Sequence, residues 1–300
     1  MVNLGAIDPF LATHGRVLDR RWLDALLGRG DAAPALRALA GYRNEDGGYG
    51  WGLEPDQRSP SSQPIGALHA LELLADLGPA GGPAARATCD WLAAVSLPDG
   101  GVPFSLAGAA GPGVAAWFAG ADVAASSLHL TAAIAEAAHR AARHDAGVRE
   151  HPWLAGATRF CLQRIADLRD VSQAMTLRYA LLLLDALDGD EPAAELRRLA
   201  ALLPASATVP VAGGAEDEAM RPLDFSPRPG TALRALIDPA AIDADLDRLE
   251  GLQRDDGGWP VEWARWSPAG ALEWRGVLTV RALRLLVDNG RVDAEALRAG

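Results

Sequence analysis

An Asp-Gly-Gly tripeptide occurs three times in this chain, and the spacing of its copies constrains the fold more than any other feature. The copies begin at Asp46, Asp99 and Asp256. The first interval is 53 residues, and the second is 157, which is close to three further steps of the same length. A period of about 52 residues in a chain of 300 is typical of a protein built from about six repeats.

Each period contains two stretches whose apolar residues have the spacing of an α-helix, and no stretch has the strict alternation of a strand. Proline at the expected first helical position marks several starts, for example after Asp8 and His151. The pattern predicts helices in six pairs, at about 8–28, 32–41, 63–78, 83–95, 122–142, 151–166, 170–187, 191–203, 226–237, 238–253, 270–289 and 293–300.

One helix of each predicted pair carries a basic residue at the same place in its apolar pattern. The aligned segments are LATHGRV, GALHALE, SSLHLTA, MTLRYAL, TALRALI and LTVRALR, and the residues are His14, His69, His129, Arg178, Arg234 and Arg281. Helix pairs that cannot bury an apolar face alone are stabilised by stacking on their neighbours. We therefore expect residues 1–300 to form a single domain, an all-α (α/α)6 toroid with six parallel inner and six outer helices, in which these residues lie at one height.

The predicted connections from outer to inner helices are mostly long, at about 42–62, 96–121, 203–226 and 254–270. They would gather at one mouth of the toroid, and long loops on a rigid scaffold often carry the functional site. We therefore expect the site at this mouth.

Composition and net charge argue against several classes of function. The net charge of −11, without a basic cluster, argues against nucleic acid as a partner. All 28 basic residues are arginine, so Schiff-base chemistry on lysine is excluded. The two cysteines, Cys89 and Cys161, lie in apolar helical patterns, and no segment reads as a signal peptide or as a span of roughly 20 apolar residues. A reduced, cytoplasmic protein without metal or cofactor is expected.

Gln253, Gly257 and Trp259 match the QxxxGxW element repeated in squalene and oxidosqualene cyclases and in protein prenyltransferase β subunits. The segment from Asp46 to Tyr49 is similar to a variant of that element. The resemblance implies an α/α toroid and a small hydrophobic partner such as an isoprenoid. The DxDD, DDxxD and zinc-ligand motifs of those enzymes have no counterpart in this sequence, so the resemblance concerns the scaffold.

Loop carboxylates are the candidate acids. Asp56, in a Glu-Pro-Asp turn that the other repeats lack, and Glu54 are candidates for proton donation, with His69 or His129 adjusting the proton. The alternative is that these carboxylates accept hydrogen bonds from loop amides. Candidates for substrate binding are aromatic residues and arginines, which also have structural explanations in loop packing and ion pairing: Trp51, Tyr49, Trp117, Trp259, Trp263, Arg178, Arg234 and Arg281.

Three functions fit these features. The leading hypothesis is a terpenoid cyclase-like enzyme, which would carry out acid-initiated cyclisation or isomerisation of a hydrophobic substrate. The second is a carbohydrate hydrolase or lyase on the same scaffold, and the third is a binding or scaffold protein that is not catalytic. A deep apolar cavity favours the first, an open polar groove the second, and a filled barrel the third.

Overall fold

The computed structural model describes residues 2–298, and most of them are helical, which confirms the predicted helical class. The α-helices are α1 (Ile7–His14), α2 (Val17–Leu26), α3 (Ala33–Ala40), α4 (Pro64–Asp76), α5 (Gly82–Val95), α6 (Ala116–Ala119), α7 (Leu128–Ala142), α8 (Ala146–Arg149), α9 (Pro152–Ile165), α10 (Ala174–Ala186), α11 (Asp190–Ala200), α12 (Pro222–Phe225), α13 (Pro239–Gly251), α14 (Pro268–Asp288) and α15 (Ala294–Arg298). The remaining elements are the 3-10 turns η1 (Leu4–Ala6), η2 (Gly78–Gly81) and η3 (Arg234–Leu236) and an antiparallel pair, β1 (Val209–Pro210) and β2 (Ala219–Met220).

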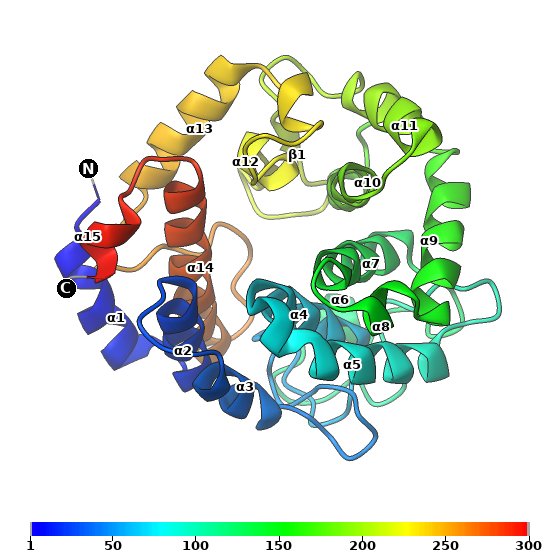
Figure 1. Cartoon of the computed structure of the whole chain (residues 1–300), viewed down its shortest axis with the longest axis horizontal. Helices are drawn as coiled ribbons and strands as arrows, with labels where there is room; N and C mark the ends of the chain where they lie inside the picture. Colours follow the sequence, from blue (N-terminus) through cyan, green and yellow to red (C-terminus); the bar gives the residue numbers. More distant parts are fainter. Residues whose placement is uncertain (1, 299–300) are drawn as a thin grey trace.

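The helices lie in two layers around the centre of the molecule (Figure 1). Helices α4, α7, α10 and α14 lie nearer the centre, and α5, α9, α11 and α13 lie outside them. The burial of side chains agrees with these two layers. Helices α4 and α7 bury residues around most of their circumference, whereas α11 buries only Leu196 and Leu199. The many alanines of α7 leave room for its neighbours α4 and α10 to pack closely against it.

The predicted helix at 8–28 is wrong, because the chain breaks into α1 and α2. Gly15 leaves the helix with extended backbone angles, and Asp19 in the first turn of α2 accepts a hydrogen bond from the backbone N–H of Arg16 at 3.0 Å. The break lets α1 pack against α14 at the other end of the chain. Gln253 joins the two ends, because its side chain accepts a hydrogen bond from the Asn3 backbone N–H at 2.6 Å and donates one to the Asn3 carbonyl at 3.1 Å.

The predicted helix at 226–237 is also wrong. Apart from the short turn η3, this stretch is irregular, and it follows the β1–β2 hairpin and the one-turn helix α12. Its sequence explains the difference, because Pro227 and Pro229 cannot donate helical hydrogen bonds and Gly230 has a positive φ of 76°. Segment 203–237 therefore occupies the position between α10 and α14 where an inner helix was expected.

The three Asp-Gly-Gly copies form the same turn. In each, the aspartate Oδ1 accepts a hydrogen bond from the second glycine N–H, at 3.0 Å for Asp46 and 3.1 Å for Asp99 and Asp256. The middle glycine has a positive φ of 91–93°, which a residue with a Cβ rarely adopts. The motif is therefore a structural device that repeats with the fold.

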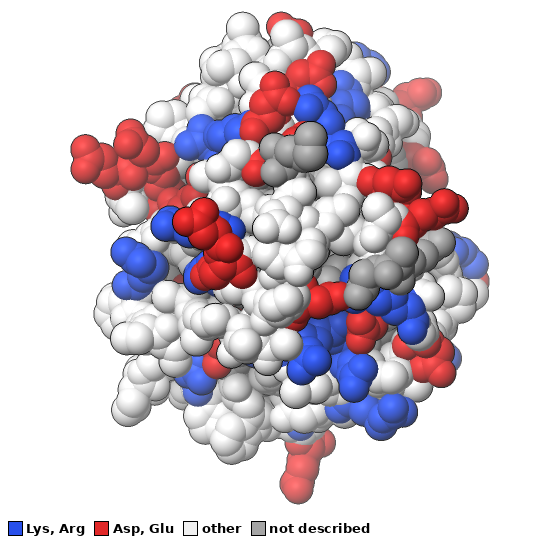
Figure 2. Space-filling model, turned by 90° about the vertical axis from the view of Figure 1, so that its left-hand side faces the viewer, with Lys and Arg blue, Asp and Glu red and all other residues white. Residues whose placement is uncertain are grey.

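None of the helices in residues 2–298 is both long enough and apolar enough to span a membrane. Figure 2 shows the molecule from the left-hand side of Figure 1. On this face acidic and arginine side chains are interspersed.

Candidate functional site

A cavity of about 640 Å³ lies between the inner helices and the long loops. This volume is in the range of small-molecule sites. Its wall includes most of the predicted site residues, namely Glu54, Asp56, His69, His129, Trp117, Trp259, Trp263, Arg178 and Arg281.

Asp56 provides a buried carboxyl group on this wall. The residue is 3% exposed, and its Oδ2 accepts a hydrogen bond from Trp274 Nε1 at 2.8 Å. Burial, followed by the nearby charge of Glu54, raises the pKa of Asp56 to about 6, against the lowering effect of hydrogen bonds from Trp274 and Trp263. Asp56 is therefore partly protonated near neutral pH, as a general acid must be.

A charged chain of four side chains stands beside Asp56. His69 Nε2 lies 2.5 Å from Glu54 Oε2, and His69 Nδ1 lies 2.9 Å from Glu72 Oε2. Arg281 Nη2 donates to the same Glu72 oxygen at 2.5 Å. Burial alone would lower the pKa of His69, but its hydrogen bonds to Glu54 and Glu72 outweigh burial and raise it. Each ring nitrogen of His69 therefore faces a carboxylate oxygen, an arrangement that favours the protonated imidazole.

Glu72 is a site residue that sequence reasoning missed. It lies one helical turn after His69 on α4, at the spacing that places two side chains on one face. Burial raises the pKa of Glu72, but Arg281 and then His69 more than compensate and hold it well below its ordinary range. The signal that could have found it is a charged pair in a helix that is otherwise apolar around most of its circumference.

Aromatic rings cover the wall next to Asp56. The ring centroids of Trp263 and Trp274 are 4.9 Å apart in an edge-to-face arrangement, and His69 meets Trp274 edge-on at 5.8 Å. Phe104 and Phe118 stack at 5.3 Å on another part of the wall. Aromatic faces of this kind stabilise positive charge in a bound ligand.

The two predicted histidines have different surroundings. His69 contacts the acidic loop, whereas the ring of His129 stacks on Tyr179 at 5.3 Å and meets Phe104 at 5.7 Å. Burial, and then the charge of Arg178, lowers the pKa of His129 to about 4. His129 is therefore neutral at physiological pH.

The charged groups at the ends of α4, α7 and α14 are paired. Asp76 is bound by Arg140 and Arg284 and accepts a hydrogen bond from Trp22 Nε1 at 3.2 Å. Glu136 accepts one from Arg228 at 2.9 Å. The opposite charges in these pairs largely compensate one another.

Three predicted binding residues lie away from the cavity. Trp51 is 58% exposed and donates to Asn44, whereas Tyr49 is 1% exposed in the core. Arg234, expected on an inner helix, bonds to Ser226 and Asn289 instead. His14, expected in line with the other basic residues, lies exposed on α1.

Trp259 and Trp117 lie at opposite extremes of exposure on the cavity wall. Trp259 is 2% exposed, and its Nε1 donates to the Leu249 carbonyl at 2.8 Å, which is a structural role. Trp117 is 42% exposed, with its ring 6.0 Å from that of Trp266.

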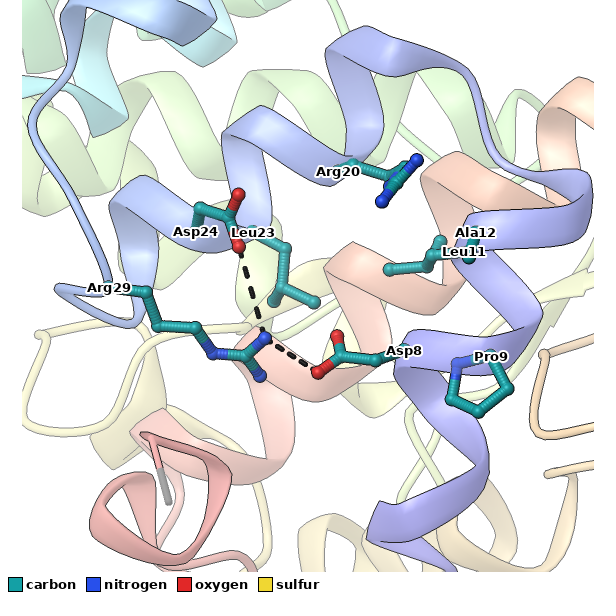
Figure 3. Close-up of a pocket in the computed structure, with 8 residues that line it drawn as sticks. All are labelled: Asp8, Pro9, Leu11, Ala12, Arg20, Leu23, Asp24 and Arg29. Carbon is teal, nitrogen blue, oxygen red and sulfur yellow. Dashed lines mark hydrogen bonds and ion pairs between the residues drawn. The ribbon is translucent and has the colours of Figure 1, made fainter. Parts of the chain in front are cut away.

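A second depression, of about 430 Å³, lies between α1 and α2 (Figure 3). Arg29 bridges Asp8 at 2.7 Å and Asp24 at 3.9 Å across it. Its guanidinium also donates to the Leu297 carbonyl at 2.8 Å. These contacts tie α1, α2 and the C-terminal helix together, which is a structural role.

Comparison with known proteins bears on the fold alone. No protein-family model matches this chain, and no curated protein does. A solved crystal structure of a protein from Actinoplanes is similar, with a TM-score of 0.54 and 18% sequence identity over 94% of this chain and 98% of that chain. At this identity the likeness concerns the arrangement of the chain and not its activity.

The raised pKa of Asp56 predicts a pH-dependent cost to stability. The native state holds this proton up to about pH 6, compared with an ordinary value of 3.8. Stability therefore falls as pH rises from about 4 to 6, by up to about 3 kcal/mol for a shift of about two units. Urea unfolding should show the free energy of Asp56→Asn rising relative to the unmodified protein by this amount over that range. A difference between Asp56→Asn and the unmodified protein that stays flat over this pH range would contradict the prediction.

Proposed function

We propose that the chain is an α/α toroid with an irregular segment in place of one inner helix, and that it is a terpenoid cyclase-like enzyme. Its reaction is acid-initiated cyclisation or isomerisation of an isoprenoid or similar hydrophobic substrate. The observation that carries the proposal is Asp56, a buried carboxyl group with a pKa near 6 on the wall of an aromatic-lined cavity.

The environments of the two loop carboxylates separate their roles. Glu54 faces His69 at 2.5 Å, whereas Asp56 faces Trp274, and the charge of Glu54 favours the protonated form of Asp56. Two neighbouring carboxyl groups in different environments are a common basis for acid–base catalysis.

In the proposed reaction, the Asp56 carboxyl group donates its proton to one carbon of a substrate double bond. The carbon skeleton becomes a cation, and the faces of Trp263 and Trp274 stabilise it. Loss of a proton from a neighbouring carbon to the Asp56 carboxylate gives a neutral product and restores the acid. The product is therefore an isomer of the substrate.

Because the product is an isomer of the substrate, mass spectrometry can test the proposed reaction. We would incubate the protein with farnesol, geranylgeraniol and squalene in D2O and analyse extracts by gas chromatography and mass spectrometry. The expected product has the carbon skeleton of an isomer and carries one deuterium at the protonated carbon. Lack of any isomer from this panel, together with no hydrophobic molecule in a lipid extract of the purified protein, would contradict the proposal.

A carbohydrate hydrolase is the second candidate. The observation that favours it is the pair of exposed tryptophans, Trp117 and Trp266, at 42% and 45% exposure, because exposed aromatic side chains mark binding surfaces. Hydrolysis adds one water to the substrate. Release of reducing sugar from oligosaccharides would therefore favour this candidate over the first.

A further inference from the structure

His129 on α7 and Tyr179 on α10 line the cavity and carry polar groups that make no hydrogen bond within residues 2–298. These groups are the ring nitrogens of His129 and the hydroxyl of Tyr179. Arg178 lies beside them, with its guanidinium carbon 5.0 Å from the centroid of the Tyr179 ring. Polar groups that line a cavity without a partner mark the place where a ligand supplies one.

The charge of Arg178 is less compensated than that of the other arginines on this wall. Its Nε donates to the Asp224 carbonyl at 3.1 Å, and its Nη1 lies 3.9 Å from the Met220 sulfur and 3.7 Å from Asp224 Oδ1. The closest carboxylate oxygen, that of Asp224, is 3.7 Å away and outside hydrogen-bond distance. By contrast, Arg281 and Arg228 bind carboxylates at 2.5 Å and 2.9 Å. A guanidinium group without a close carboxylate partner can bind the carboxylate or phosphate of a ligand.

The charge of the subsite selects the ligand. His129 is neutral because burial, and then Arg178, lowers its pKa to about 4, and burial raises the pKa of Tyr179 above its usual range. The subsite of His129, Arg178 and Tyr179 therefore carries one positive charge and neutral hydrogen-bonding groups. One guanidinium matches a carboxylate, which it can bind through two parallel hydrogen bonds. The several charges of a diphosphate would exceed what it provides.

We propose that His129, Arg178 and Tyr179 form a carboxylate subsite, and that the substrate is an amphipathic hydrophobic acid whose hydrocarbon part extends along the aromatic wall towards Asp56. This inference rests on the proposed function for the role of Asp56. The subsite itself is a statement about binding and is tested separately.

The test uses three probes: retinoate, retinol and farnesyl diphosphate. Retinoate and retinol share a hydrocarbon skeleton and differ in the carboxylate, and binding of either is measured by quenching of tryptophan fluorescence. Farnesyl diphosphate is assayed by its displacement of bound retinoate. The unmodified protein should bind retinoate at least about tenfold more tightly than retinol or farnesyl diphosphate. Loss of a charge-assisted hydrogen bond in Arg178→Gln should weaken retinoate binding by roughly 10- to 100-fold and leave retinol binding unchanged.

Two further variants distinguish a specific loss of retinoate binding from a general effect on folding. Tyr179→Phe keeps the ring that stacks on His129 and removes only the hydroxyl, so it should weaken retinoate binding by several-fold. Arg248→Gln is the matched control, because Arg248 is held by Asp245 and Glu262, each at 2.7 Å, and it should leave the preference for retinoate unchanged.

Three results would each contradict the proposed subsite. They are equal affinity for retinoate and retinol, tighter binding of farnesyl diphosphate than of retinoate, and an equal loss of affinity for both retinoids in Arg178→Gln. The Asp56→Asn protein separates the two proposals. If it and the unmodified protein prefer retinoate equally while neither forms an isomeric product, the subsite stands and the proposed function fails. If isomers form but retinoate is not preferred, the reverse holds.

Discussion

For the reaction proposed above, we expect Asp56→Asn to reduce turnover by about 100- to 10,000-fold, the range that a positioned general acid contributes. Asparagine has nearly the same shape, and its side-chain oxygen can still accept the hydrogen bond that Trp274 gives to Asp56 at 2.8 Å. It has no acidic proton to donate. The loss should therefore fall on kcat with little change in KM, measured as formation of deuterated isomer.

The pH profile and a second carboxylate variant check the same assignment. Because the acid must be protonated, turnover should decline as pH rises above about 6, the pKa of Asp56. Glu54→Gln removes the charge that raises this pKa, so the decline should begin at lower pH. Glu262→Gln, an exposed carboxylate on the same wall, should retain turnover within a few-fold. Full turnover in both Asp56→Asn and Glu54→Gln would show that neither carboxylate is the acid.

Trp259→Ala will lower the free energy of unfolding by about 3–5 kcal/mol, as removal of a large buried aromatic side chain does. The side chain is 2% exposed, and its Nε1 donates to the Leu249 carbonyl at 2.8 Å. The truncation leaves a cavity in the loop that joins α13 to α14 and removes one of the two hydrogen bonds that the Leu249 carbonyl accepts. Urea unfolding followed by circular dichroism measures the loss.

Trp51→Ala is the matched control, because Trp51 also follows an Asp-Gly-Gly turn but is 58% exposed. Its replacement should cost less than about 1 kcal/mol, as expected for a surface substitution. Comparable losses of unfolding free energy in the two variants would show that the difference in burial between Trp259 and Trp51 does not determine their contributions to stability.

The helical class could be predicted because it depends on local pattern. Apolar spacing located most of the helices, including α4, α9 and α13, and proline at the first helical position marked their starts. The wrong helix at 8–28 reflects packing, because α1 ends at Gly15 and packs against α14. The wrong helix at 226–237 has a local cause, because Pro227 and Pro229 interrupt the helix that the repeat pattern suggested.

The candidate site could be predicted only in part. The repeat alignment separated Asp56 from the structural Asp-Gly-Gly turn, and the basic residues led to His69, His129, Arg178 and Arg281 on the cavity wall. The partners of these residues could not be read from the sequence. Trp274 and Arg281 are more than 200 residues away from Asp56 and Glu72, the carboxylates that they bind.

The sequence by itself determined the repeat, the helices and the Asp-Gly-Gly turns, because each depends on interactions within a few residues. Only the tertiary structure decided which charged groups are paired and which are not. Glu54, His69, Glu72 and Arg281 satisfy one another, whereas Arg178 contacts a carbonyl and a thioether and has no carboxylate within hydrogen-bond distance in residues 2–298. Burial and pairing set the pKa values, and both depend on contacts between distant segments. The raised pKa of Asp56 and the weakly paired guanidinium of Arg178 therefore exist only in the folded chain.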